Sequence, residues 1–200
     1  LAHRDAVGKE RSPYHYVSPM GPTTYALCQK SFLGPAMWIA GLCAFPPLFS
    51  GQNIDLSTTG ALVTKSFEVP VEKNYLLAVR FEFPSNEARL SDQIVGERYS
   101  EHCQDDVRYD AIPEGQRKSL GQPIPFRVVI RKTADHSTVI DRTFVSLCVT
   151  SHDGENAKTR TIGWLPLATG NYVAEVTNLE GQSGLLGVKT SISLYGGQGK

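Results

Sequence analysis

The stretch Thr161-Ile162-Gly163-Trp164-Leu165-Pro166-Leu167-Ala168-Thr169-Gly170-Asn171-Tyr172-Val173-Ala174-Glu175-Val176 decides the fold of this chain. Large apolar residues precede a Thr-Gly-Asn turn, and an alternating apolar segment begins directly after that turn. This layout predicts a corner of a β-sandwich, at which the chain leaves one sheet and enters the other. We expect the apolar side chains of this corner to fill the interior, namely Trp164, Leu165, Leu167 and Tyr172.

Alternation of apolar and polar residues indicates further strands outside the corner. It is clearest in residues 75–83, where every second side chain is apolar. The expected strands are residues 61–69, 75–83, 125–132, 138–150, 159–165, 172–176 and 188–194. About seven short strands separated by turn signals predict an all-β, antiparallel, immunoglobulin-like β-sandwich.

The order of the corner residues and the cysteines leaves the strand topology open. Leu167, Gly170 and Tyr172 have the spacing of the tyrosine corner found in immunoglobulin-like domains. Trp164 follows both Cys103 and Cys148, however, so the Cys–Trp–Cys order of true immunoglobulin domains is absent.

Residues 1–50 are predicted to be a leader, and residues 51–200 the folded domain. No charged residue lies in residues 31–54, and a basic residue precedes the apolar run at residues 32–45. These features are typical of a secretory signal peptide. The run is too short for a spanning helix, which needs about 20 apolar residues. An uncleaved anchor and a segment of the fold are the alternatives.

Several details of the leader stay open. Met20 would be a more ordinary start than Leu1, and cleavage after Ala44 or after Ser50 would leave a small final residue. Cys43 is a candidate lipidation site. The predicted location is the periplasm or the cell envelope. The Gly-, Ser- and Thr-rich residues 51–60 are expected to form a tether.

Residues 84–123 form a connection far longer than a hairpin needs, and we call it the insertion. Structureless loops beyond about 12–15 residues are uncommon in compact domains and are often functional. Leu90 and Ile94, four residues apart, indicate one or two helical turns, so the insertion is expected to be partly helical. It is either a solvated flap or a partner-binding surface, whose candidate residues are Arg89, Glu97, Arg98, Tyr99, Asp105, Asp106, Arg108 and Tyr109.

The two cysteines after the leader, Cys103 and Cys148, are expected to form a disulfide in an oxidising compartment. Such a bond would join the insertion to the strand that carries Cys148, and closing this loop would contribute roughly 3–4 kcal/mol in the chain-entropy model. In the cytosol both cysteines would be free thiols.

Composition and motifs give no indication of catalysis. The formal net charge is +0, so no overall field attracts nucleic acid. His102 and Cys103 are adjacent and the other histidines are isolated, unlike the short regular spacing of zinc ligands. The Gly-x-Ser-x-Gly elbow of hydrolases and a glycine-rich phosphate loop are absent from the sequence. We expect a protein that is not an enzyme and uses no metal or cofactor.

The chain resembles a bacterial family of exported β-sandwich domains of unknown function, some of them similar to envelope immunity proteins. The residues that carry the resemblance are Phe67-Glu68-Val69-Pro70, residues 75–83, residues 125–131 and Gly170-Asn171-Tyr172. The resemblance implies a small envelope protein without assigned catalytic residues.

We therefore expect an exported binding module that recognises a protein through the insertion, as an immunity or inhibitor protein does. The first alternative is a carbohydrate- or cell-wall-binding module, which would need exposed aromatic rings; the candidates are Tyr99, Tyr109 and Tyr195. The second is a hydrolase whose acids and base come from the insertion, with Asp105, Asp106 and His102 as candidates.

Overall fold

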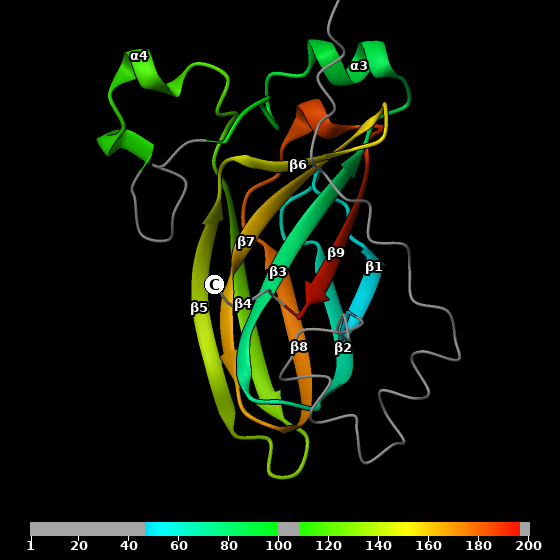
Figure 1. Ribbon diagram of the computed structural model, residues 1–200, viewed down its shortest axis with the longest axis vertical. Helices are drawn as coiled ribbons and strands as arrows, with labels where there is room; N and C mark the ends of the chain where they lie inside the picture. The colour runs from blue at the N-terminus through cyan, green and yellow to red at the C-terminus, as the bar shows by residue number, and fades with distance from the viewer. Residues whose placement is uncertain (1–46, 100–108, 197–200) are drawn as a thin grey trace, which may run out of the picture. The chain divides into compact units, whose positions relative to one another are not determined.

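The computed structural model describes residues 47–99 and 109–196, which form two antiparallel sheets with short helices at one end (Figure 1). The strands are β1 (Phe49–Asn53), β2 (Leu62–Val69), β3 (Lys73–Glu82), β4 (Ile124–Lys132), β5 (Thr138–Ser146), β6 (Val149–Asp153), β7 (Ala157–Leu167), β8 (Gly170–Asn178) and β9 (Lys189–Tyr195). The helical elements are α3 (Asn86–Ser91), η2 (Tyr109–Ala111), α4 (Glu114–Arg117) and η3 (Ser183–Leu185).

The strand order is β1-β9-β3-β7-β6 in the first sheet and β2-β8-β4-β5 in the second. We call them sheet A and sheet B. The predicted all-β antiparallel sandwich is confirmed. An immunoglobulin-like topology is not confirmed by this order.

The sequence prediction lacked two of the strands, β1 and β6. The predicted strand at residues 138–150 is divided at residues 147–148, so that β5 belongs to sheet B and β6 to sheet A. The chain thus crosses between the sheets inside a stretch that contains no Gly, Pro or Asn to mark a turn.

The predicted tether at residues 51–60 is wrong. β1 pairs with β9 and begins at Phe49, so the strand lies across the predicted boundary between residues 50 and 51. Ile54 and Leu56 are buried, and the Ile54 N–H donates to the Thr190 carbonyl at 3.1 Å. Glycine and small polar residues conceal this edge strand, because only a few of its side chains face the core.

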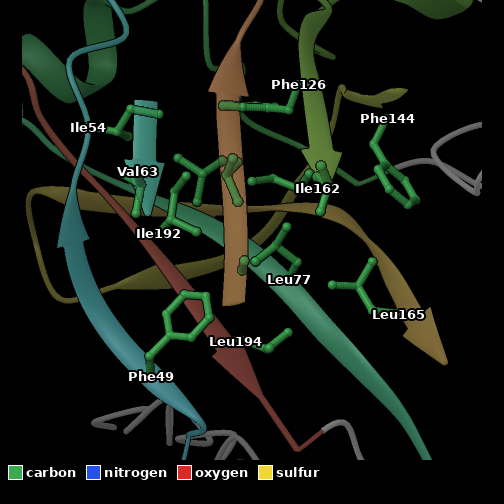
Figure 2. Packing of buried hydrophobic residues seen from close by; sticks show 14 of the residues in the cluster. Phe49, Ile54, Val63, Leu77, Phe126, Phe144, Ile162, Leu165, Ile192 and Leu194 are labelled. Atoms are coloured by element: carbon green, nitrogen blue, oxygen red, sulfur yellow. The ribbon is translucent and has the colours of Figure 1, made fainter. Parts of the chain in front are cut away.

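The core lies between the two sheets and draws on both (Figure 2). Sheet A contributes Leu77, Ile162 and Leu165, and sheet B contributes Val63 and Phe126. Each of these side chains occupies the inward position of an alternating strand, as the period of two predicts.

Trp164 does not fill the interior, contrary to the sequence prediction. Its relative exposure is 41%, while Leu165 and Leu167 are buried beside it. Successive side chains of a strand point to opposite faces, so burying Leu165 and Leu167 places Trp164 on the outer face of sheet A.

The corner itself is held by the hydroxyl of Tyr172, which donates to the Ala168 carbonyl at 3.0 Å. Tyr75 makes the same kind of contact at the β2–β3 turn, where its hydroxyl donates to the Val71 carbonyl at 2.6 Å. Burial raises the pKa of Tyr75, an effect that this hydrogen bond partly offsets. The β2–β3 and β7–β8 turns both connect sheet A with sheet B, and each is fixed by the hydroxyl of a buried tyrosine.

Replacement Tyr172→Phe is expected to lower the free energy of unfolding by about 1 kcal/mol, because one partly buried hydrogen bond is lost. Chemical denaturation measures this change. Tyr99→Phe is the matched control, since Tyr99 is 55% exposed and should tolerate the replacement. Equal effects at the two positions would contradict a structural role for the Tyr172 hydroxyl.

Candidate functional site

The described parts of the insertion are joined at their base by two glycines. Gly96 and Gly121 have φ values of +81° and +85°, and a Cβ on either would lie 2.5–2.7 Å from backbone atoms near the other. The Glu97 N–H donates to the Ser119 carbonyl at 2.9 Å, and the Gln122 N–H donates to the Ile94 carbonyl at 2.7 Å. Backbone groups from both sides of the base are thus paired directly with each other.

The carboxylate of Asp92 organises the loop that follows α3. Its two oxygens accept backbone N–H groups of Ile94, Val95 and Gly96 at 3.0–3.2 Å. Its Oδ2 also accepts from the Lys158 Nζ at 3.1 Å. The side chain of Asp92 is only 5% exposed, so a nearly buried charge ties the loop to strand β7.

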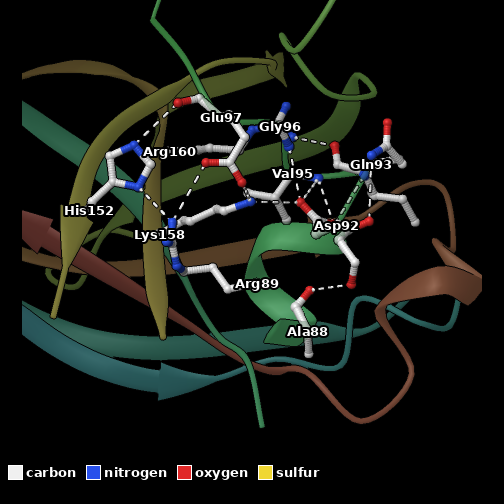
Figure 3. Close-up of polar contacts among 12 residues, drawn as sticks. Ala88, Arg89, Asp92, Gln93, Val95, Gly96, Glu97, His152, Lys158 and Arg160 are labelled. Atoms are coloured by element: carbon white, nitrogen blue, oxygen red, sulfur yellow. Dashed lines mark hydrogen bonds and ion pairs between the residues drawn. The ribbon is translucent and has the colours of Figure 1, made fainter. Parts of the chain in front are cut away.

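Lys158 is fully buried between two carboxylates (Figure 3). Its Nζ lies 3.1 Å from Asp92 Oδ2 and 2.6 Å from Glu97 Oε1, and it also lies 5.2 Å from the centre of the Phe83 ring. The contact to Glu97 is an ion pair whose angle does not suit a hydrogen bond. A buried ammonium requires such paired charges, because losing its hydration costs several kcal/mol.

Arg160, two residues further along β7, is also fully buried. Its guanidinium donates to the carbonyls of Gln122 at 2.9 Å, Ile94 at 3.3 Å and Ser146. Burial lowers the pKa of Arg160 to about 9, and the negative charge of Asp92 offsets part of this shift. The folded pKa lies below the ordinary 12.5, so the charged guanidinium costs stability at neutral pH, and this cost decreases only above about pH 9.

Arg89 and His152 complete the arrangement on its solvent side (Figure 3). Arg89 Nη1 lies 3.6 Å from Glu97 Oε2, and 3.4 Å from His152 Nδ1. His152 Nε2 lies 3.2 Å from the Glu97 carbonyl oxygen. We call the charged side chains of this region the ion cluster, defined as Arg89, Asp92, Glu97, Lys158 and Arg160.

The ion cluster is arranged for anchoring rather than for reaction. Asp92 and Lys158 point at each other and at backbone groups, and Arg160 binds carbonyls from three segments. Within residues 47–99 and 109–196, no group of three or more His, Cys, Asp and Glu side chains is arranged to hold a metal ion. The arrangement fixes the two ends of the insertion to strand β7.

The predicted partner-binding residues divide into three groups. Arg89, Glu97 and Arg98 make intramolecular contacts; Arg98 donates to the Gln116 and Lys118 carbonyls at 2.7 and 3.0 Å. Tyr109 has the Arg117 guanidinium 5.1 Å from its ring centre, and Tyr99 is 55% exposed. Asp105, Asp106 and Arg108 lie outside the described residues, as do His102 and Cys43. Partner binding by these residues stays a prediction.

Cys148 lies in a small second core, separate from the main one, together with Ile112, Leu120 and Leu147. No cysteine in the described part of the chain is free. Cys103 lies outside that part, so the pairing of Cys103 with Cys148 stays a prediction.

A second notable surface lies on the outer face of sheet A. Leu76 of β3 is the cross-strand partner of Trp164 on β7 and of Tyr195 on β9. These three side chains therefore form a row across three adjacent strands, which we call the aromatic row. Trp164 is 41% and Tyr195 36% exposed, and Leu76 is half-buried between them.

Among the described residues, the rows of sheet A directly beside the aromatic row carry no charge. The next row along the strands consists of Ala78, Thr161 and Ser193, and on the other side Asn74 pairs with Pro166. Ion pairs lie further away on both outer faces: Arg80 pairs with Glu82 and Asp153 on sheet A. On sheet B, the pairs Arg127–Asp141 and Arg131–Glu175 cross the strands.

Sequence reasoning singled out Tyr195 but placed Trp164 in the core. The missed signal is the parity of β7, in which Leu165 and Leu167 already occupy the inward positions. Lys158 and Arg160 have the opposite parity, that of Ile162, because the register of β7 shifts opposite Leu77 and Ala78. Charged residues on the apolar face of Ile162 indicate a buried ion cluster.

Within the part of the chain that the structure describes, no helix has the length and apolar character needed to cross a membrane.

Comparison with known proteins identifies the fold and leaves the ligand open. Residues 52–196 match the model of the family described as Domain of unknown function (DUF5625). No curated protein matches the chain. A solved structure from Sulfurospirillum deleyianum has a TM-score of 0.56 and 21% identity, and the match covers 75% of this chain and 97% of that one. At this identity the likeness concerns the fold alone.

Two carbohydrate-binding modules are more distant. The CBM35 module of Abf62 from Cellvibrio japonicus has 12% identity and a TM-score of 0.34, covering 78% of this chain and 89% of that one. A CBM35 module in complex with a glucuronic acid containing disaccharide has 13% identity and the same TM-score, with 78% and 88% covered. These scores are too low to support an argument about fold or ligand.

Proposed function

The chain belongs to the DUF5625 family, a family of unknown function, and we propose that it is a carbohydrate-binding module that holds its ligand against the aromatic row. The observation that carries this proposal is the exposure of Trp164 and Tyr195 in one row of sheet A whose directly neighbouring rows are uncharged. The proposal favours the alternative function that the sequence suggested over recognition of a protein through the insertion.

The chemistry of the aromatic row suits a sugar. One face of a pyranose ring presents C–H groups, which pack against an aromatic ring and remove apolar area from water. The hydroxyl groups at the edge of the sugar need hydrogen-bond partners, and Asn74 and Thr161 lie in the rows beside the aromatic row. The uncharged rows beside the aromatic row also match an uncharged ligand.

The aromatic row is prepared for binding before a ligand arrives. Trp164 and Tyr195 are only about two fifths exposed, so neighbouring side chains hold part of each ring. The strands that carry them are paired with β3. Ordering a free side chain at an interface costs about 0.5–1.5 kcal/mol. Rings that are already held by a sheet avoid much of this cost.

The insertion and the aromatic row differ in how many side chains are available to bind a partner. Arg89, Glu97 and Arg98 of the insertion are engaged in contacts within the chain, whereas the rings of the aromatic row face solvent. We propose further that the domain acts outside the cytoplasm, as the predicted leader indicates, where glycans of the cell surface or surroundings are accessible.

Native gel electrophoresis in gels that contain a soluble polysaccharide tests the proposal. Hydroxyethyl cellulose, glycol chitin, xylan and soluble starch are the probes. We expect at least one to retard the protein, and Trp164→Ala to weaken that binding about tenfold or more, because the replacement removes one complete stacking contact.

Tyr99→Ala is the matched control, since it removes an exposed ring from the insertion and leaves the aromatic row intact. Thermal unfolding of all variants establishes that they remain folded. If the wild-type protein migrates unchanged in every gel, or if Trp164→Ala binds like the wild type, the aromatic row is not a carbohydrate site.

A further inference from the structure

The direction and spacing of the aromatic row restrict the shape of its ligand. Leu76 is paired directly with both Trp164 and Tyr195, so the three side chains follow a line perpendicular to the strands. Their strands β7, β3 and β9 are consecutive in sheet A (Figure 1). Two steps of the usual strand spacing separate the aromatic residues by roughly 10 Å at the backbone.

This separation is about the length of two sugar units in an extended β-1,4-linked glycan. In such a chain the linkages are equatorial, so that the sugars form a straight, flat ribbon with apolar C–H faces. An α-1,4-linked chain coils instead and cannot lay successive sugars on a flat surface. A single sugar would reach only one of the two rings.

We propose that the ligand is a straight β-1,4-linked glycan that lies across strands β7, β3 and β9, with one sugar on Trp164, the next over Leu76 and the third on Tyr195. This inference rests on the proposed carbohydrate-binding function and adds the linkage class, the direction and the smallest complete ligand, a trisaccharide. On the described parts of β7, β3 and β9, the rows beside the aromatic row place no ionic group next to such a chain.

The predicted consequence is a dependence of affinity on chain length. A disaccharide covers one ring and Leu76, whereas a trisaccharide covers both rings. If each stack contributes an amount typical of an aromatic contact at an interface, the second stack raises affinity about tenfold. Sugars beyond the third do not contact the aromatic row and add little binding energy. The affinity should therefore reach a plateau for chains longer than the trisaccharide.

Isothermal titration with two series of oligosaccharides tests the inference. The first series is β-1,4-linked, with cello- and chito-oligosaccharides of two to six sugars, and the second is the α-1,4-linked malto-oligosaccharides. We expect the steepest increase, about tenfold, between two and three sugars of a β-1,4 series. We also expect maltohexaose to bind at least about tenfold more weakly than the β-1,4-linked hexamer.

Variants separate the two ends of the row. Tyr195→Ala should abolish the advantage of the trisaccharide over the disaccharide, and Trp164→Ala should do the same. Trp164→Phe keeps a ring and should retain part of the advantage. Tyr99→Ala, with its ring on the insertion, should behave like the wild type.

The outcomes distinguish this inference from the function on which it rests. Equal affinities for disaccharide and hexasaccharide, no effect of Tyr195→Ala, or tight binding of maltohexaose would overturn the extended chain while the domain remained a carbohydrate binder. Failure of every polysaccharide in the gel experiment would overturn the carbohydrate-binding function itself.

Discussion

Replacement Asp92→Asn is expected to lower the free energy of unfolding by about 3–5 kcal/mol, the usual result of breaking a buried charge pair. The Lys158 ammonium, which is fully buried, would keep only Glu97 as a counter-charge, and the side chain of Glu97 is 36% exposed. The amide nitrogen of asparagine would in addition face backbone N–H groups that now donate to a carboxylate. Urea denaturation measures the change.

Asp141→Asn is the matched control for this experiment. Asp141 also pairs with a cation, at 2.8 Å from Arg127, but both side chains are about half exposed. Water and salt screen such a pair, so its loss should leave stability nearly unchanged. Similar effects of the two replacements would show that the ion cluster does not anchor the insertion. Limited proteolysis should also detect earlier cleavage in residues 84–123 of the Asp92→Asn variant.

Replacement Gly121→Ala is expected to cost about 3 kcal/mol or more, because steric overlap adds to backbone strain. The φ of Gly121 is +85°, and an added Cβ would lie 2.5 Å from the carbonyl oxygens of Ile94 and Val95. Both contacts are to backbone, so relief requires the two sides of the insertion base to separate. The midpoint of urea unfolding measures the loss.

Gly154→Ala distinguishes overlap from strain. Gly154 has a φ of +70°, but an added Cβ there meets nothing within 4 Å. Only the strain of a left-handed backbone remains. The expected loss of stability is about 1 kcal/mol, because replacing glycine also lowers the conformational entropy of the unfolded chain and so offsets part of the strain. Equal losses at Gly121 and Gly154 would contradict the direct contact between the two sides of the base.

The sequence predicted the sandwich because its long strands keep a strict period of two. Residues 75–83 and 125–132 alternate clearly, and the structure places them in β3 and β4. Prediction failed where few side chains carry the pattern, as in β1, or where the chain changes sheets without a turn signal, as between β5 and β6. Strand pairing over long sequence distances, such as β1 with β9, leaves no local signal at all.

The two functional candidates differ in how far the sequence could reveal them. The exposure of Trp164 follows from alternation only when it is counted back from Leu165, because the register shift of β7 opposite Leu77 and Ala78 reverses the parity relative to Ile162. The ion cluster is different, because Asp92 and Lys158 are 66 residues apart and meet only through the fold. Lys158 shares the parity of the buried Ile162, but no feature of the sequence identifies Asp92 as its counter-charge.

The pairing of β1 with β9 has a mechanical consequence. The strands are antiparallel neighbours, and Phe49 at the start of β1 faces Leu194 near the end of β9. A force that pulls these two ends apart would therefore open the strand pair one hydrogen bond at a time, like a zipper, rather than shear all of them together. A ligand that contacts both Tyr195 and Leu76 would link β9 to β3 at the centre of sheet A. The edge strand β1 would then be the first strand to detach under force.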